Sequence, residues 1–347
     1  MKIHEKYIKR CIQLAEGGLG TTYPNPLVGS VIVHNNKIIG EGWHRKAGET
    51  HAEVNAINSV KDFQLLPEST IYVSLEPCSH FGKTPPCSDL IVERGIKRVV
   101  IGTMDPFAKV AGKGIKKLME AGCEVMVGVL EEECKALNKR FFTFHKKQRP
   151  YIILKWAETA NGFIAPQYQD QRRPVWITNP YSKQLVHKWR TEEQAILVGT
   201  NTAIQDNPKL NSRNYSGNDP IRIVLDQYLK IPADSALYDQ SQKTIIVCGK
   251  NLNQENTENL EFLEMDFSEN IAQTICNQIY QKEIQSVIIE GGRNTLQQFI
   301  DAGLWDEARI FIGNSVFKKG IKAPEITGTL YAEEKIISDE LKMYRND

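Results

Sequence analysis

The residues with the clearest chemical potential lie between positions 51 and 87. They are His51, Glu53, Cys78 and Cys87. Imidazole and thiolate groups are preferred ligands of zinc, and a catalytic zinc site usually keeps three protein ligands and one position for water. Bound zinc lowers the pKa of water from about 15.7 to roughly 7, and a nearby carboxylate can carry the released proton. This set could therefore replace an amino group on a heterocycle by oxygen.

The local sequence predicts how these side chains are presented. Thr50 is expected to be the N-cap of a helix, with His51 and Glu53 on its first turn. Residues 69–75 are rich in strand-forming and apolar side chains, as is typical of a buried strand. This strand would deliver Cys78 to its end.

The two cysteines are farther apart than in the usual signature of zinc-dependent base deaminases, H-x-E followed by P-C-x-x-C. The intervening residues 79–86 add His80 and Lys83, which could contact a substrate. An alternative is a closed structural zinc site with His80 or His44 as the fourth ligand, but such a site has no use for Glu53. Disulfide pairing is disfavoured because the seven cysteines are scattered and odd in number.

Length and composition indicate a soluble protein of two domains. A chain of 347 residues is long for one hydrophobic core, and 41% hydrophobic with 24% charged residues is typical of globular proteins. The net charge of +1 gives no electrostatic argument for a nucleic-acid partner. No apolar run approaches the length of a membrane span, and the N-terminus has no signal-peptide pattern. Together with the unpaired cysteines, these features predict a cytoplasmic protein.

Strand and helix patterns alternate through the first half, which predicts an α/β domain with a mostly parallel sheet. Besides the segments above, we expect a helix over 3–15, a hairpin of 27–34 and 37–42, strands at 97–102 and 124–129, and helices at 87–94, 114–121 and 131–145. The polar segment 147–150 is predicted to link a first domain, 1–146, to a second, 151–347.

A second α/β pattern follows this segment. Strands are expected at 151–157, 195–199, 221–226, 244–249, 286–290 and 308–313, and helices at 181–191, 271–281 and 295–302. No assignment is made for 251–270. Neither common nucleotide-binding glycine motif is present, but Glu290-Gly291-Gly292 lies between a strand and a helix. Such a turn is either a phosphate-binding site at a helix N-terminus or a plain connection.

Together these motifs resemble the bifunctional deaminase–reductase family of riboflavin biosynthesis. The first half carries the family's segments at 24–29, 51–53 and 74–87, and the long loop in the last of these separates the family from cytidine and tRNA deaminases. The second half carries the segments at 154–157, 176–178, 196–199, 206–208 and 290–292. The resemblance covers nearly the full chain. It implies two three-layer α/β domains, the N-terminal one cytidine-deaminase-like and the C-terminal one dihydrofolate-reductase-like.

The resemblance implies two consecutive reactions. The first domain would use one Zn²⁺ to hydrolyse the ring amino group of a diaminopyrimidinone that carries a ribosylamino 5′-phosphate. The second would reduce the ribosyl group to ribityl with hydride from NADPH. The implied partner is thus a phosphorylated small-molecule pyrimidine, with no nucleic acid or membrane, and the chain is expected to form a homo-oligomer through the reductase domain.

The resemblance also assigns roles to individual residues. In the deaminase, the zinc ligands would be His51, Cys78 and Cys87, the proton carrier Glu53, and the substrate contacts Asn25, His80 and Lys83. In the reductase, the cofactor contacts would be Ala157, Trp176, Thr202, Asp206, Gly292, Arg293, Asn294, Thr295, Leu296, Gln297 and Gln298. The substrate contacts there would be Arg190, Leu210, Arg213 and Glu290.

Lys155 lies inside an apolar strand, where lysine is rarely buried without a reason. It could polarise the imine or carbonyl group of the ring-opened sugar, with Glu290 as its counter-ion. Two arginines, Arg190 and Arg213, suit a phosphate because the planar guanidinium binds it with two hydrogen bonds.

The chain departs from the family at two positions. Asn161 stands where the family usually has aspartate, and Pro174 stands where a small hydroxyl residue is common. Two other functions stay open at this point. One is a nucleoside or tRNA deaminase whose C-terminal domain is not catalytic. The other is a non-catalytic zinc protein whose second domain binds nucleotides.

Overall fold

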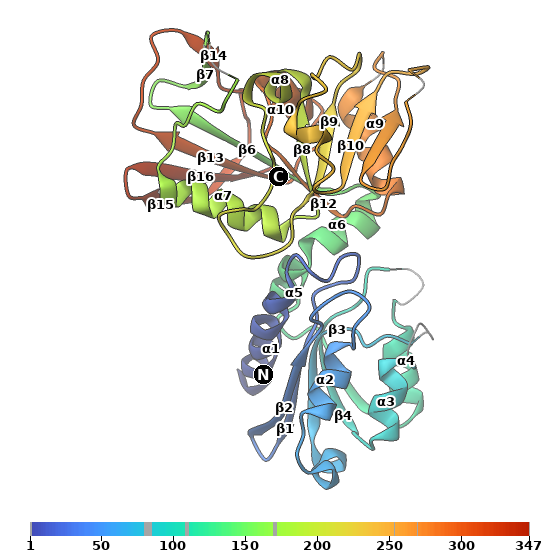
Figure 1. Cartoon of the computed structure of the whole chain (residues 1–347). Helices are drawn as coiled ribbons and strands as arrows, with labels where there is room; N and C mark the ends of the chain where they lie inside the picture. Colours follow the sequence, from blue (N-terminus) through green and yellow to red (C-terminus); the bar gives the residue numbers. More distant parts are fainter. Residues whose placement is uncertain are drawn as a thin grey trace. The chain divides into compact units, whose positions relative to one another are not determined.

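The computed structural model divides the chain into two compact units, Met1–Gln148 and Arg149–Asp347 (Figure 1). The division falls inside the segment for which the sequence predicts a linker. The residues that the structure describes are 2–79, 85–107, 111–168, 172–252, 254–268 and 270–346.

The first unit contains a five-stranded sheet in the order β2-β1-β3-β4-β5. Its strands are β1 (Gly29–His34), β2 (Lys37–Trp43), β3 (Thr70–Leu75), β4 (Arg98–Thr103) and β5 (Glu124–Val127). Strands β3, β4 and β5 are parallel, whereas β1 is antiparallel to both β2 and β3. The sheet is therefore mixed rather than mostly parallel, because the predicted hairpin inserts β1 beside β3. The hairpin turns at Asn35 and Asn36, whose positive φ angles of 46° and 62° suit a tight two-residue turn.

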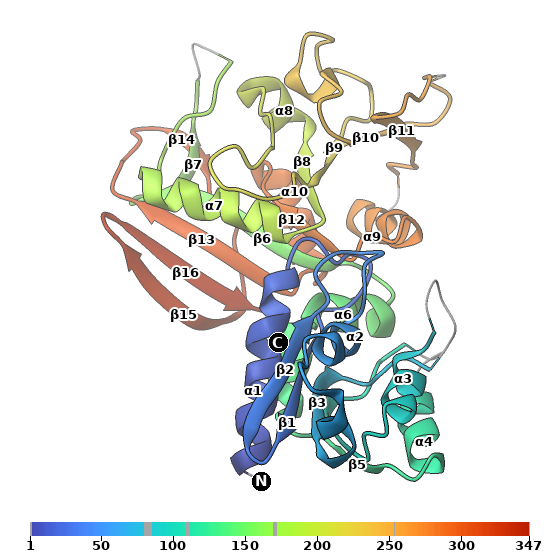
Figure 2. The same ribbon diagram turned by 60° about the horizontal axis from the view of Figure 1, so that its bottom comes forward.

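Helices cover both faces of this sheet, as Figures 1 and 2 show. One face packs against α2 (Ala52–Asn58), α3 (Cys87–Glu93) and α4 (Lys113–Glu120) through a buried aliphatic core. The other face packs against α1 (Lys2–Ala15) and α5 (Glu131–Leu137). The three layers place the amino end of α2 and of α3 near the end of β3.

The prediction of one helix over 131–145 is wrong. The segment forms two helices, α5 and α6 (Lys139–Lys147), which are separated by Asn138. The buried side-chain amide of Asn138 accepts a hydrogen bond from the Leu27 N–H and donates one to the Leu27 carbonyl, both at 2.8 Å. These two bonds satisfy backbone groups of a residue that precedes β1, and they account for an asparagine at the helix junction.

The second unit contains a nine-stranded sheet in the order β11-β10-β9-β8-β12-β6-β13-β16-β15. The first seven of these strands are parallel to their neighbours, and β16 and β15 extend the sheet as an antiparallel hairpin. Their bounds are β6 (Tyr151–Thr159), β8 (Ala195–Gly199), β9 (Ile221–Leu225), β10 (Thr244–Cys248), β11 (Leu260–Glu264), β12 (Ser286–Ile289), β13 (Glu307–Gly313), β15 (Thr329–Ile336) and β16 (Asp339–Arg345). A separate pair consists of β7 (Phe163–Pro166) and β14 (Gly320–Lys322).

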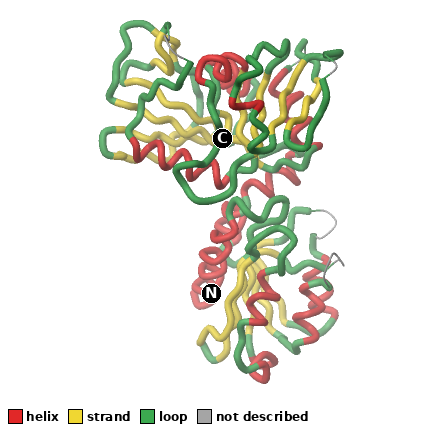
Figure 3. Tube along the Cα trace, in the orientation of Figure 1, coloured by secondary structure: helices red, strands yellow, loops and turns green. Residues whose placement is uncertain are grey.

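This second sheet also lies between two helical layers, shown in red around the yellow strands in Figure 3. One face carries α9 (Ile271–Gln281) and α10 (Arg293–Asp301), and the other carries α7 (Pro180–Glu192) and α8 (Thr200–Asp206). The prediction of two three-layer α/β domains is confirmed. None of the described helices combines the length and apolar character that crossing a bilayer requires.

Candidate active sites

The first candidate site brings three predicted metal ligands together. His51 directly precedes α2, Cys78 follows the end of β3, and Cys87 is the first residue of α3. The His51 Nδ1 atom lies 3.6 Å from Cys78 Sγ and 3.3 Å from Cys87 Sγ, and all three ligand atoms lie within 4.8 Å of one another. In a tetrahedral zinc site, nitrogen and sulfur ligands are about 3.5 Å apart. The three side chains therefore fit a zinc ion.

The start of α2 differs from the prediction by one residue. His51, not Thr50, is the N-cap, and its backbone is extended with φ −72° and ψ 165°. The Thr50 hydroxyl instead donates to Asn55 Oδ1 at 2.6 Å. The helix therefore begins after His51, which leaves the imidazole free to face the two cysteines, while Glu53 stays on the first turn.

Glu53 is buried beside these ligands, with 3% of its surface exposed. Burial, followed by the nearby Cys78 sulfur, raises the pKa of Glu53 to about 7. The neighbouring Cys78 is held by a backbone hydrogen bond from the Cys87 N–H at 3.2 Å. A carboxyl group in this position can hold or release a proton near neutral pH.

Asn25 and His44 form a second layer beside this site. The Asn25 amide nitrogen lies 3.0 Å from His44 Nε2, and His44 Nδ1 lies 3.2 Å from the Thr50 carbonyl oxygen. The carbonyl can only accept, so Nδ1 carries the proton and Nε2 accepts from Asn25. Burial lowers the pKa of His44, which favours this neutral form. With both ring nitrogens engaged, His44 is not available as a fourth zinc ligand. His80 and Lys83 lie outside the described residues.

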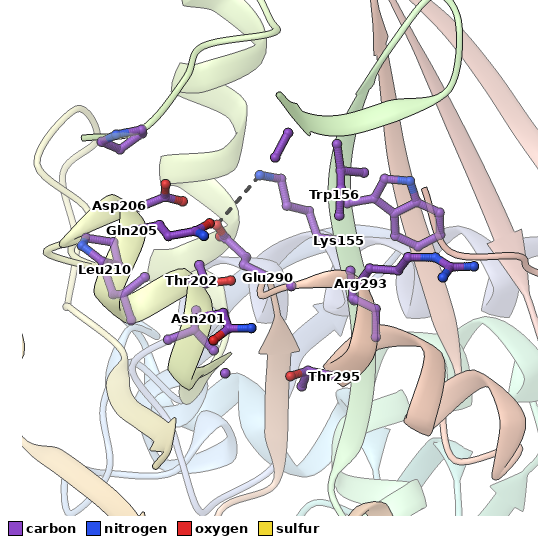
Figure 4. A pocket seen from close by; sticks show the side chains of 18 of the residues that line it. Lys155, Trp156, Asn201, Thr202, Gln205, Asp206, Leu210, Glu290, Arg293 and Thr295 are labelled. Atoms are coloured by element: carbon purple, nitrogen blue, oxygen red, sulfur yellow. Dashed lines mark ion pairs between the residues drawn. The ribbon is translucent and has the colours of Figure 1, made fainter. Parts of the chain in front are cut away.

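The second candidate site is a pocket of about 750 Å³ in the second unit (Figure 4). It opens at the carboxyl ends of β6, β8 and β12, the edge at which parallel α/β sheets bind ligands. Its size suits a cofactor together with part of a substrate. The lining includes these predicted residues: Lys155, Ala157, Trp176, Arg190, Thr202, Asp206, Leu210, Arg213, Glu290, Gly292, Arg293, Asn294, Thr295, Leu296 and Gln298.

Gln297 is the one predicted cofactor residue that does not line the pocket. Its side-chain amide donates to Asp301 Oδ1 at 2.8 Å and to the Glu325 carbonyl at 3.2 Å. These bonds hold it along the outside of α10, because it lies on a different face of the helix from Thr295 and Gln298.

A carboxylate between two cations lies in this pocket. Glu290 accepts two hydrogen bonds from Arg190, at 3.0 and 2.8 Å, and its Oε2 atom lies 3.6 Å from Lys155 Nζ, the ion pair that is dashed in Figure 4. Burial opposes ionisation of Glu290, but Arg190 and Lys155 outweigh it and lower the pKa of Glu290 to about 2. Burial also lowers the pKa of Lys155, and Glu290 partly offsets this. The three groups thus form one cluster in which the Glu290 carboxylate lies between Arg190 and Lys155.

The turn before α10 brings backbone N–H groups to the same pocket. Gly292 is the N-cap of α10, with φ +66°, and no side chain caps this helix end. A Cβ on Gly291 would lie 2.6 Å from the Val198 Cα atom, so this turn lies directly against β8. Free N–H groups at a helix N-terminus are suited to bind phosphate.

Comparison with known proteins decides the family. Residues 1–103 match the family model "Cytidine and deoxycytidylate deaminase zinc-binding region", and residues 150–317 match "RibD C-terminal domain". The riboflavin biosynthesis protein RibD of Aquifex aeolicus is 39% identical over 94% of this chain and 91% of that protein. The chain belongs to the RibD family. The RibD of Actinobacillus pleuropneumoniae is also 39% identical, over 95% of this chain and 86% of that protein.

Solved RibD structures share the whole fold. The Thermotoga maritima diaminohydroxyphosphoribosylaminopyrimidine deaminase/5-amino-6-(5-phosphoribosylamino)uracil reductase is 36% identical, with a TM-score of 0.89 and 99% of each chain covered. Acinetobacter baumannii RibD gives a TM-score of 0.89 at 30% identity, again with 99% of each chain covered. The chain is therefore a bifunctional enzyme of riboflavin biosynthesis, with a zinc-dependent deaminase and an NADPH-dependent reductase. A nucleoside or tRNA deaminase with a non-catalytic second domain is not favoured.

Several residues that line the pocket of this RibD family member were not predicted, and two of them are titratable residues of α7. Lys183 and His187 line the pocket from α7, about two turns and about one turn before Arg190, respectively. Lys183 Nζ lies 3.4 Å from the centre of the Trp176 ring, and His187 Nδ1 lies 3.0 Å from the Asn211 carbonyl. Burial, Arg190 and Arg213 lower the pKa of His187 to about 4. Their spacing from Arg190 on a predicted helix is the sequence signal that could have found them.

The two departures from the RibD pattern lie in different surroundings. Asn161 does not line the pocket. Its side chain accepts from the Thr159 hydroxyl at 2.8 Å and donates to the Phe317 carbonyl at 2.8 Å. Pro174 does line the pocket. A proline can give no side-chain hydrogen bond there.

Proposed function

We propose that residues 1–146 deaminate a diaminopyrimidinone ribosylamino 5′-phosphate and that residues 151–347 reduce its ribosyl group, with 147–150 as linker. The single observation that carries this proposal is the pairing of two separate sites in one chain. One is the cluster of His51, Cys78 and Cys87 beside buried Glu53. The other is the pocket that contains Lys155 and Glu290.

In the deaminase, His51, Cys78 and Cys87 would hold zinc, which when bound would supply an activated water. Glu53 takes a proton from the water and returns it to the departing amino group. Its raised pKa suits both directions of transfer. Asn25, fixed by its contact with His44, presents its amide to the pyrimidine edge. We assign substrate contacts to His80 and Lys83 as well.

In the reductase, NADPH supplies the hydride. The turn at Gly292 and the N-terminus of α10 would hold its phosphates, and Ala157, Trp176, Thr202 and Asp206 would contact the rest. Lys155 donates a hydrogen bond to the imine nitrogen or carbonyl oxygen of the ring-opened sugar. Glu290 holds Lys155 in place through their ion pair. The substrate phosphate would bind Arg190 and Arg213, with Leu210 against the ring and Lys183 as a further cation.

The test uses zinc-loaded protein and the diaminopyrimidinone substrate without NADPH. Mass spectrometry should detect a product in which one ring amino group has been replaced by oxygen, with the ribosyl group unchanged. Addition of NADPH should then convert this product to the ribityl compound. Reduction before deamination, or no change in the ring, would contradict the proposed order and the assignment of the first site.

We also propose that the protein is cytoplasmic and forms a homo-oligomer through its reductase domain. In support of a cytoplasmic location, all seven cysteines are free, as is usual in a reducing compartment.

In support of oligomerisation, the edge strand β15 and its turn expose Leu330 and Ile337, with 45% and 68% of their surfaces accessible. Light scattering during size-exclusion chromatography tests whether the protein forms a homo-oligomer. A monomer at micromolar concentration would contradict it.

A further inference from the structure

Glu76 lies two residues before the proposed zinc ligand Cys78 and is almost fully buried, with 4% of its surface exposed. Its carboxylate accepts four backbone hydrogen bonds. Oε1 accepts from the N–H groups of Gly114 and Ile115, at 2.9 and 3.3 Å. Oε2 accepts from the N–H groups of Gly112 and Asp105, at 2.9 and 3.3 Å. No lysine or arginine among the described residues forms an ion pair with it.

These bonds cap helix α4 from a different element. The helix begins at Lys113, and its N-cap residue Gly112 has no side chain to satisfy the first N–H groups. The charge of Glu76 satisfies them instead, and it also interacts favourably with the positive end of the helix dipole. A buried carboxylate of this kind holds α4 against the end of β3.

The same helix end lies directly against the residue between Glu76 and Cys78. A Cβ on Gly114 would lie 2.0 Å from the Pro77 carbonyl oxygen, so only glycine permits this approach. Proline also restricts its own backbone φ angle. The segment from Glu76 to Cys78 is therefore held at three successive residues: at the Glu76 side chain by the cap, at Pro77 by the packing of Gly114, and at the Cys78 sulfur by the Cys87 N–H.

We infer that Glu76 is a positioning residue of the zinc site, and that its cap on α4 sets the place of the Cys78 sulfur. The four hydrogen bonds of its carboxylate all come from backbone N–H groups, so it would act on the site through the position of Cys78. The inference rests on the proposed function, in which Cys78 holds zinc. Groups that orient a metal ligand typically change metal affinity by 10–100-fold when they are replaced.

The test compares the zinc affinity of wild-type protein and Glu76→Gln by competition with a chelator of known affinity. Glutamine has the same shape, but its amide nitrogen would face two N–H donors in place of an acceptor. We expect zinc affinity to fall 10–100-fold, while reduction of pre-deaminated substrate by the second unit stays unchanged. Glu76→Asp, which keeps both acceptor oxygens on a shorter side chain, should give an intermediate loss.

A matched control is Asp62→Asn. Asp62 also caps a helical turn of the first unit with its carboxylate, accepting from the Gln64 N–H at 3.0 Å, and it contacts none of the zinc ligands. Its replacement should leave zinc affinity unchanged. Equal zinc affinity in wild type and Glu76→Gln would overturn the inference, as would an equal loss in Asp62→Asn. Absence of zinc binding by the wild type would instead overturn the proposed function.

Discussion

The two candidate sites use buried carboxylates in opposite ways. Burial raises the pKa of Glu53 to about 7, so this group can exchange a proton at neutral pH. Glu290 is also buried, but Arg190 and Lys155 lower its pKa to about 2, so it stays charged and holds Lys155. The chemistry of each site therefore depends on what surrounds the carboxylate, which the residue type alone does not reveal.

Glu53→Gln should abolish ammonia release while zinc stays bound. Glutamine fills the same space but cannot take up a proton, and loss of a general acid–base group typically lowers the rate by about 10²–10⁴-fold. Ammonia release and zinc content of the purified variant measure the two effects. Turnover at the wild-type rate would remove Glu53 from the proposed role.

Lys155→Ala should greatly lower NADPH oxidation with pre-deaminated substrate, by about 10²-fold or more if the lysine polarises the reacting group. Ammonia release should not change, since the first site does not include Lys155. The two rates are measured on the same preparation. Wild-type NADPH oxidation would show that Lys155 has no part in the reduction.

Glu290→Gln should destabilise the second unit in a pH-dependent way. The folded-state pKa of about 2 lies below the usual 4.5, so the charged group stabilises the fold above about pH 4.5, and this is lost as the pH falls toward 2. The free energy of unfolding of the variant should be roughly 3 kcal/mol lower than that of the wild type at pH 7. This gap should shrink to about half by pH 3. Urea unfolding of variant and wild type at both pH values measures it. If the variant were destabilised by the same amount at pH 7 and pH 3, the loss of stability would come from packing and not from the charge of Glu290.

At the scale of elements, periodic and buried segments could be predicted from the sequence. The observed bounds of β8 and α9 are those predicted, and β3 and α3 differ by one residue at an end. These segments face a core on at least one side, so their pattern follows the period of the element. The strands β11, β15 and β16 were not predicted. β15 is exposed on both sides over most of its length, so it carries no alternating apolar pattern.

The candidate sites also contain features that could be predicted from the sequence and features that could not. The grouping of His51, Cys78 and Cys87, the proposed zinc ligands, could be predicted because their residue types are specific and close in the chain. The hydrogen bonds that connect Asn138 to Leu27 span 111 positions, and those of Glu76 reach α4 through backbone N–H groups. Such contacts depend on where elements meet in space, and residue types alone do not encode backbone partners.

Asn138→Ala tests the element scale. It would leave the buried N–H and carbonyl groups of Leu27 without partners, which should destabilise the first unit by about 2 kcal/mol or more. Since Leu27 is two residues from Asn25, we also expect a raised KM for deamination with a smaller change in kcat. Asn138→Asp keeps the acceptor for the Leu27 N–H but places a buried carboxylate oxygen against the Leu27 carbonyl, so it should not restore the lost stability. An unchanged KM would show that this junction supports the fold alone.

At the scale of the whole molecule, the chain contains two units that each have their own sheet, core and candidate site. The match to RibD proteins over 94% of the chain assigns both activities to one enzyme. Because the described residues of each site come from one unit, a substitution in one unit should leave the reaction of the other intact. Glu53→Gln should therefore lose deamination and keep reduction, whereas Lys155→Ala should lose reduction and keep deamination.

The most direct measurement is a coupled assay on purified, zinc-loaded protein that follows ammonia release and NADPH absorbance together after addition of the diaminopyrimidinone ribosyl phosphate. We expect ammonia release followed by loss of an equal amount of NADPH. Ammonia release without NADPH loss, also with pre-deaminated substrate, would contradict the reductase assignment and point to Pro174 in the pocket. Absence of both signals would contradict the proposed substrate.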